Sequence, residues 1–243
     1  MSTRQKRKFN KAINKFMLIS YISLAIIFLF IGLLLVFHKP IISDLIAPQK
    51  IENSYKKHAI PLKYNSYQSN IDSLNPNLAF NFNAVKPINL MDIKDVEFDK
   101  RYMIGQIAIP NVHLNLPIFY GISNNNLWFG ACTMKPHQQM GEGNYALAGH
   151  TMPNETLLFT PIHSMQKGVT IYLTDSKNVY IYKTQNNQLV NKEHRNVIND
   201  VQDKKLLTLV TCSDLKGTKR LIVTAHFVNK ERLNNSNKQL FNI

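Results

Sequence analysis

The sequence is poor in cysteine and in acidic residues, and it has a single long apolar run. Its 2 cysteines allow at most one disulfide, Cys132–Cys212, which an extracytoplasmic location would permit. Lys and Arg total 29 against 15 Asp and Glu, so the formal net charge is +14. A basic balance of this size suits nucleic acid, anionic lipid headgroups or an anionic wall polymer. Because no helix-turn-helix, zinc-finger or aromatic RNA-binding signature occurs, we expect no nucleic-acid partner.

The apolar run at residues 16–37 contains no charged residue and predicts a transmembrane helix. A helix of this length spans roughly 33 Å, enough for the hydrocarbon core of a bilayer. A cleaved signal peptide is the alternative, but its apolar part is shorter and ends in a small-residue cleavage site, whereas His38-Lys39-Pro40 follows here.

Residues 1–15 predict a cytoplasmic tail, because they carry basic side chains and no acidic ones. Its basic residues are Arg4, Lys6, Arg7, Lys8, Lys11 and Lys15. We therefore expect a single-pass protein of the cell membrane, with its N-terminus in the cytoplasm and the remainder outside the cell. These six charges leave +8 for the rest of the chain.

Residues 38–98 are expected to form a stalk, with one short helix at most. Pro48 interrupts a helical pattern at residues 41–46. Residues 65–89 are rich in Asn and Ser, as a poorly ordered linker would be. The last fifteen residues of the chain are mostly polar, so we expect no second membrane span.

From about residue 99 to residue 243 the apolar pattern changes to a period of two, which is typical of β-strands. Alternating runs occur at residues 112–120, 169–173, 179–181 and 221–227. Segments rich in Asn, Gly and Pro separate them, and helical patterns are confined to short pieces near residues 154–159 and 195–202. The pattern predicts an all-β domain, which we interpret as a small β-barrel with short helices in its loops.

The segment from Leu207 to Cys212 predicts a strand that ends in a cysteine, and Arg220 opens the next predicted strand. In an antiparallel hairpin these two side chains would face each other, with Cβ atoms roughly 5 Å apart. A cation beside a cysteine favours the thiolate, which is the nucleophilic form. His150 ends another strand-like segment of small residues. A cysteine, a histidine and an arginine together suggest acyl transfer through a thioester.

These segments resemble the sortase family. Thr208-Leu209-Val210-Thr211-Cys212 matches the Thr-Leu-x-Thr-Cys signature of that family, with an arginine on the next strand. Residues 141–151 are similar to the segment that precedes the family's catalytic histidine, and residues 107–119 to the first strands of its barrel. The resemblance runs from about residue 103 to 228. It implies a closed eight-stranded β-barrel, with the catalytic domain in residues 99–243.

The single N-terminal anchor and the short loop between Cys212 and Arg220 look like class A, the housekeeping sortases of Gram-positive bacteria. Some members of that class bind calcium through acidic loop residues. This sequence has no dense acidic cluster, so we expect no cofactor and no metal site, although calcium dependence stays open.

The resemblance implies a membrane-anchored cysteine transpeptidase. Cys212 would attack the threonine carbonyl of a Leu-Pro-x-Thr-Gly (LPxTG-type) sorting signal on a surface protein. His150 would protonate the departing glycine amine, and Arg220 would hold the signal and stabilise the oxyanion. An amine of a peptidoglycan precursor would then resolve the thioester. The implied substrate contacts are Ile198, Val201, Val210 and Thr211.

Other interpretations of these residues stay open. Arg220 could pair with Asp214 on the surface, and His150 could be a structural strand histidine. Cys132 suits a small apolar filler. A zinc site could use Cys132, His137, His150 and Cys212, although their spacing lacks the usual paired ligands. The alternative functions are another wall cysteine transpeptidase or peptidase, and a non-catalytic module that binds anionic polymers through the +8 excess.

Overall fold

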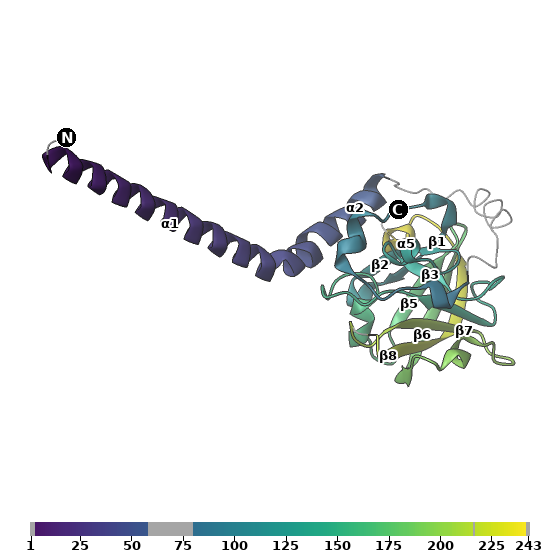
Figure 1. Ribbon diagram of the computed structural model, residues 1–243. Helices are drawn as coiled ribbons and strands as arrows, with labels where there is room; N and C mark the ends of the chain where they lie inside the picture. Colours follow the sequence, from purple (N-terminus) through teal and green to yellow (C-terminus); the bar gives the residue numbers. More distant parts are fainter. Residues whose placement is uncertain (1–2, 58–79, 216, 242–243) are drawn as a thin grey trace.

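The computed structural model describes residues 3–57, 80–215 and 217–241 (Figure 1). Eight strands close into a barrel in the order β1-β2-β3-β4-β7-β8-β6-β5. The strands are β1 (Met103–Ile109), β2 (Leu114–Phe119), β3 (Ala131–Thr133), β4 (Asn144–Ala148), β5 (Thr170–Thr174), β6 (Asn178–Asn191), β7 (Leu206–Cys212) and β8 (Lys219–Arg232). The barrel confirms the all-β, eight-stranded fold expected from the sequence.

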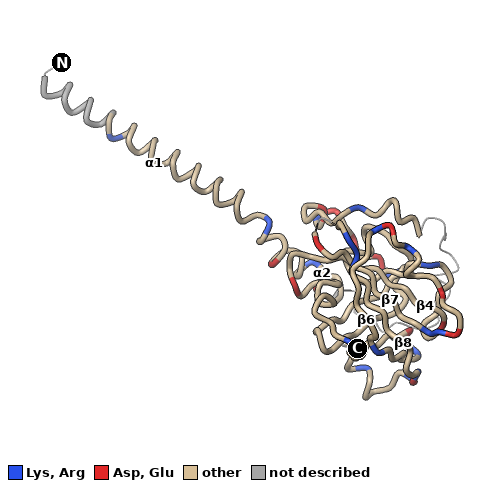
Figure 2. The backbone as a smooth tube through the Cα atoms, turned by 90° about the horizontal axis from the view of Figure 1, so that it is seen from below, with Lys and Arg blue, Asp and Glu red and all other residues tan. Residues whose placement is uncertain are grey.

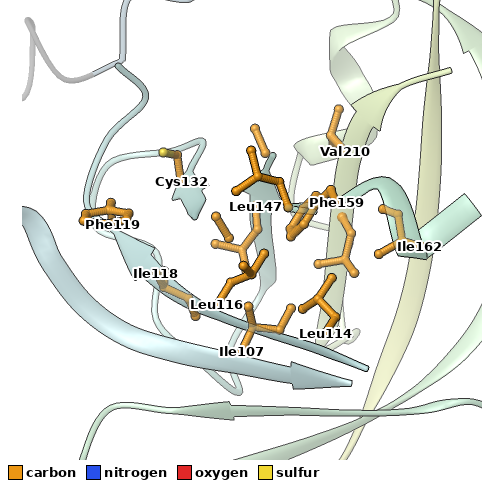
Figure 3. Close-up of a cluster of buried hydrophobic side chains, with 14 of the residues drawn as sticks. Ile107, Leu114, Leu116, Ile118, Phe119, Cys132, Leu147, Phe159, Ile162 and Val210 are labelled. Atoms are coloured by element: carbon orange, nitrogen blue, oxygen red, sulfur yellow. The ribbon is translucent and has the colours of Figure 1, made fainter. Parts of the chain in front are cut away.

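The barrel interior is filled by apolar residues of the strands and of one loop. Figure 3 shows Ile107 of β1, Leu116 of β2 and Leu147 of β4 within one cluster, with Phe159 among them. All four side chains are buried. Burial of one such side chain stabilises the fold by about 1.5–3 kcal/mol.

The outer face of β2 is covered as well. Phe119 follows Ile118 and therefore points to the opposite face of the strand. Its ring packs edge-to-face on Phe98, with the ring centroids 5.4 Å apart. Because segments on the N-terminal side of the barrel cover this face, β2 is buried at nearly every position instead of alternating.

Short helical turns fill the loops, as predicted. They are α5 (Asn124–Leu127), η2 (Phe82–Ala84), η3 (Leu90–Lys94), η4 (Lys100–Tyr102), η5 (Pro110–Val112), η6 (Thr160–Ser164), η7 (Arg195–Ile198) and η8 (Lys238–Phe241). The helix expected at residues 154–159 is wrong, because that segment forms turns and η6 begins only at Thr160. Pro161 suits the first turn of η6, where its missing N–H costs no hydrogen bond.

The N-terminal helix is longer than the apolar run. Helix α1 (Thr3–Ile41) passes through a π turn, η1 (Ile42–Ile46), into α2 (Ala47–Lys57). The π turn lies between Pro40 and Pro48, neither of which has the N–H that a continuous α-helix requires. Figures 1 and 2 show α1 projecting away from the barrel, and Figure 2 shows no charged residue along its middle. Within the described residues, this is one helix long and apolar enough to cross a membrane, and it fits a membrane anchor.

The described parts of residues 38–98 differ from the expected stalk, because they pack on the barrel. In α2, Ala47 and Ile51 are buried in the same core as Ile93. Lys50 Nζ donates to the carbonyls of Ile93 and Lys94, and the Tyr55 hydroxyl donates to the carbonyl of Phe129. A polar segment with few apolar residues does not reveal such packing in its pattern. Residues 58–79 of the expected stalk lie outside the described residues. The division into a tail (1–15), an anchor (16–37), a stalk (38–98) and a catalytic domain (99–243) stays a prediction.

Candidate active site

Cys212 is the last residue of β7 and lies opposite Arg220 of β8. The Ser213 N–H donates to the Lys219 carbonyl at 3.1 Å, so the neighbouring pair 213–219 is the hydrogen-bonded one. Cys212 and Arg220 therefore form a non-hydrogen-bonded pair, the kind in which side chains approach most closely. The structure thus has the facing arrangement that the sequence predicts.

His150 reaches the site through the parallel pairing of β4 with β7. Ala148 lies beside Val210, and the Gly149 N–H donates to the Val210 carbonyl at 3.0 Å. Gly149 is required here, because a Cβ at this position would lie 2.5 Å from the ring of Phe159. His150 is buried, and its ring packs edge-to-face on Trp128 at a centroid distance of 6.4 Å.

One pocket of about 440 Å³ is lined by His150, Cys212 and Arg220 together. Among the predicted substrate contacts, Val210, Thr211 and Ile198 also line it. Val201 does not, and it is 44% exposed. The structure therefore brings six of the seven predicted site residues to one cavity and leaves Val201 on the outer surface of its loop.

Gly217 lies close to both the thiol and the guanidinium. A Cβ on Gly217 would lie 3.7 Å from Cys212 Sγ and 3.6 Å from Arg220 Nη1, so both atoms border this glycine. Its backbone has a positive φ of 66°, a conformation that favours glycine. Arg220 Nη1 donates to the carbonyls of Gly217 at 3.0 Å and Lys219 at 3.2 Å. The loop thereby holds the guanidinium beside the cysteine.

Burial dominates the electrostatics of the site. It lowers the pKa of His150 to about 4, and the charge of Arg220 acts in the same direction. Burial also raises the pKa of Cys212; Arg220 opposes that rise and Asp214 adds to it. Arg220 favours the thiolate, as the sequence predicts, but burial outweighs its effect on the pKa of Cys212. At neutral pH the thiol and the neutral imidazole predominate, and a minority of molecules hold the thiolate–imidazolium pair.

The structure holds neither the disulfide nor the zinc site considered for Cys132. Both cysteines are free thiols, so the disulfide is excluded. Cys132 is buried in β3, and burial raises the pKa of its thiol, as expected of a small apolar filler. In the part of the chain that the structure describes, no group of three or more His, Cys, Asp or Glu side chains could hold a metal ion. The proposed zinc ligands are thus not gathered into one site.

A hydrogen-bond network that the sequence did not reveal holds the backbone of the cysteine. The Thr151 hydroxyl donates to the Cys212 carbonyl at 2.6 Å, and His163 Nε2 lies 3.1 Å from the same oxygen. The Thr211 hydroxyl donates to the Gly149 carbonyl at 2.8 Å. The main-chain hydrogen bonds between β4 and β7 end at Gly149. Beyond that point, side-chain donors bind the carbonyls of Gly149 and Cys212. His163 comes from η6, and no pattern in its loop indicates this role.

A closed eight-stranded barrel, with a cysteine and an arginine facing each other at the end of β7 and a histidine beside them, defines the sortase class of cysteine transpeptidases. The family profile described as "Sortase domain" matches residues 107–228, half of the chain. The chain belongs to the sortase family.

Its relatives place it within that family in class A. It is similar to "Sortase A" of Streptococcus agalactiae serotype III, with 40% identity over 209 residues that cover 83% of this chain and 82% of the relative. It is also 35% identical over 215 residues to "Sortase A" of Listeria monocytogenes, covering 87% of this chain and 93% of the relative. The solved structure of L. monocytogenes sortase A matches with a TM-score of 0.56 and 37% identity, over 58% of this chain and 97% of that one.

Membership makes the protein a cell-wall transpeptidase and favours an enzyme over the anionic-polymer-binding module. A Gram-positive origin fits the sources of these relatives.

Proposed function

We propose that the protein cleaves an LPxTG-type sorting signal between Thr and Gly and joins the released acyl group to an amine of a peptidoglycan precursor. The observation that carries the proposal is the pocket that Cys212, His150 and Arg220 line together. Helix α1 serves as the membrane anchor, with the basic tail in the cytoplasm and the barrel outside the cell.

The first half of the reaction forms a thioester. Transfer of the Cys212 thiol proton to His150 creates the reactive pair, and the thiolate attacks the threonine carbonyl carbon. The carbonyl electron pair moves to the oxygen, where the Arg220 guanidinium stabilises the negative charge. The intermediate collapses as the imidazolium of His150 gives its proton to the departing glycine nitrogen, and the acyl group stays on Cys212.

The second half returns the enzyme to its starting state. The amine of the peptidoglycan precursor attacks the thioester carbonyl, and His150 accepts the proton that this amine loses. Collapse of the second intermediate releases the Cys212 sulfur and forms the new amide bond. The amine must compete with water, so a pocket with apolar walls favours transfer over hydrolysis. Val210 and Ile198 supply such walls and would contact the Leu-Pro part of the signal.

The proposal is tested with the full-length protein in detergent and a Leu-Pro-x-Thr-Gly peptide, with and without an added glycine-type amine. We expect cleavage at Thr–Gly, an amine-linked product when the amine is present, and no turnover by Cys212→Ala. Cleavage that never yields the amine-linked product would indicate a peptidase instead. Turnover that survives in Cys212→Ala would contradict the proposed nucleophile.

A further inference from the structure

The charges that line the active-site pocket are strongly unbalanced. Four cationic residues among those that the structure describes line it: Lys86, Lys192, Arg195 and Arg220. A single carboxylate, that of Asp214, lies among the same lining residues. Arg220 faces Cys212 and has a place in the proposed reaction. The other three cations, which we call the cationic rim (Lys86, Lys192 and Arg195), have none.

The rim is held together across two separate segments. Lys86 follows η2, whereas Lys192 and Arg195 belong to the connection from β6 to β7. Arg195 Nη2 donates to Asn83 Oδ1 at 3.2 Å and so joins the two segments.

The Lys86 side of the rim is fixed to the barrel through α5. The Lys86 N–H donates to Asn124 Oδ1 at 2.9 Å, and Asn124 Nδ2 donates to the Ala84 carbonyl at 3.1 Å. The backbone that presents Lys86 is therefore anchored at two points of one asparagine side chain.

Nearby carboxylates do little to neutralise the rim. The Lys192 Nζ lies 3.9 Å from the carboxylate of its neighbour Glu193, and the two side chains are 60% and 70% exposed. Such a pair contributes little. Asp200, farther along the same connection, is committed to Lys135 at 2.6 Å and to the Asn144 N–H. Lys86 and Arg195 form no ion pair with any residue that the structure describes.

The rim borders the apolar wall that would receive Leu-Pro. Val197 and Ile198 lie two and three residues after Arg195 and line the same pocket. A peptide whose threonine carbonyl lies at Cys212 and whose Leu-Pro part lies on this wall therefore has its x residue and the residue before Leu within the field of these cations.

We propose that the cationic rim is a specificity subsite for a substrate carboxylate, so that the preferred sorting signal carries Glu or Asp at x or immediately before Leu. This inference rests on the proposed function. The cations are exposed, so each should change kcat/KM by about three- to fivefold, mainly through KM.

The test uses the full-length protein in neutral detergent with two peptide series, which carry Glu, Gln or Lys at x or at the residue before Leu. We expect kcat/KM to fall in the order Glu, Gln, Lys in at least one series, with about tenfold or more between Glu and Lys at low salt. At about 1 M salt, where the Debye length is near 3 Å, the difference should shrink.

Two variants assign the preference to the rim. Lys192→Gln with Arg195→Gln should reduce the Glu-to-Lys ratio by about tenfold, and Lys86→Gln should reduce it further. The matched control, Lys167→Gln with Lys183→Gln, removes two positive charges outside the pocket lining and should keep the ratio.

Each failure has its own signature. Equal cleavage of all peptides, a preference for Lys, or a ratio that the rim variants leave unchanged would overturn the subsite while the proposed function stands. Absence of cleavage of every peptide would overturn the proposed function, and the subsite with it.

Discussion

Cys212 and His150 must both become ions during the reaction, yet burial disfavours the charged form of each. The pKa of His150 is lowered to about 4 and that of Cys212 is raised. A neighbouring cation alone, as in the sequence-based expectation, would have shifted the thiol in the opposite direction. In the resting site the thiol and the imidazole are therefore both neutral, and the reactive thiolate–imidazolium pair forms in a minority of molecules. A protonated thiol is oxidised less readily, because the thiolate is the reactive form.

Titration distinguishes this state from a resting ion pair. Because the pKa of Cys212 is raised above its ordinary value, thiolate absorbance and rapid alkylation should appear only in alkaline solution. Because the pKa of His150 is lowered, its ring should stay neutral until the solution is acidic, near pH 4. Ultraviolet difference spectra of wild type against Cys212→Ala, with NMR of the histidine ring, measure both. A thiolate signal already present at neutral pH would contradict the account.

Substitution of Gly217 should affect both the backbone strain at a positive φ and the packing around Cys212 and Arg220. In Gly217→Ala the methyl would lie 3.7 Å from Cys212 Sγ and 3.6 Å from Arg220 Nη1, at a φ of 66°. We expect a loss of about 1 kcal/mol of stability and a further fall of kcat/KM by about tenfold or more.

The control for that strain is Gly168→Ala. Gly168 has a φ of 90°, and the only atom near its Cβ position is Lys183 Cε at 3.9 Å. The Gly168→Ala variant should lose about as much stability in thermal unfolding as Gly217→Ala, but it should keep its activity with a sorting peptide. Equal activity losses in the two variants would show that Gly217 matters only as a turn residue.

At the scale of elements, the ends of β4, β7 and β8 position the chemistry. The facing of Cys212 and Arg220 was predictable, because an apolar run, a short polar loop and a second run specify a hairpin. The barrel strands were likewise visible in the alternation of residues 112–120 and 221–227. Contacts between elements distant in sequence could not be predicted in this way. His163 meets Cys212 across 49 positions, and nothing local in η6 signals the contact.

His163 is expected to act as a positioning residue, because it contacts the carbonyl of Cys212 and not the substrate. His163→Leu removes the donor and should lower kcat by about fivefold with little change in KM, since a hydrogen bond contributes about 1 kcal/mol. His163→Gln keeps a side-chain N–H and should restore most of the activity. The side chain is exposed, so both variants should fold.

Ser164→Ala serves as the control within the same turn. It removes the bond from Ser164 Oγ to the Pro161 carbonyl and leaves His163 in place. Steady-state kinetics with a sorting peptide measure all three variants. If the leucine and glutamine variants behave alike, or if Ser164→Ala causes the same loss, the positioning role is wrong.

At the scale of the whole molecule, the apolar helix α1 continues through η1 into α2, which packs on the surface of the barrel. Helix α2 buries Ala47 and Ile51 against the core, and the Tyr55 hydroxyl donates a hydrogen bond to the Phe129 carbonyl. The sequence showed the apolar helix clearly but not its continuation, since two prolines normally end a helix. The π turn between Pro40 and Pro48 allows the chain to continue. Docking of α2 links the apolar helix α1 to the barrel through η1 alone.

Ile51→Ala should weaken this docking. Ile51 is 4% exposed, and truncation of a buried isoleucine costs about 2–5 kcal/mol. We expect faster hydrogen exchange in α2 and easier proteolysis around it, while the barrel strands keep their protection. Gln49→Ala, at an exposed position of the same helix, should change neither. Unchanged protection of α2 in Ile51→Ala would contradict its docking on the core.

The central claim is that the Cys212 sulfur carries the acyl group in a site that His150 and Arg220 complete. Intact-mass measurement of the full-length protein after brief mixing with a sorting peptide, followed by peptide mapping, tests it most directly. The account predicts a mass increase equal to the peptide acyl portion, located on Cys212 and discharged when a glycine-type amine is added. An adduct on Cys132, or turnover without any adduct that the amine can discharge, would contradict it.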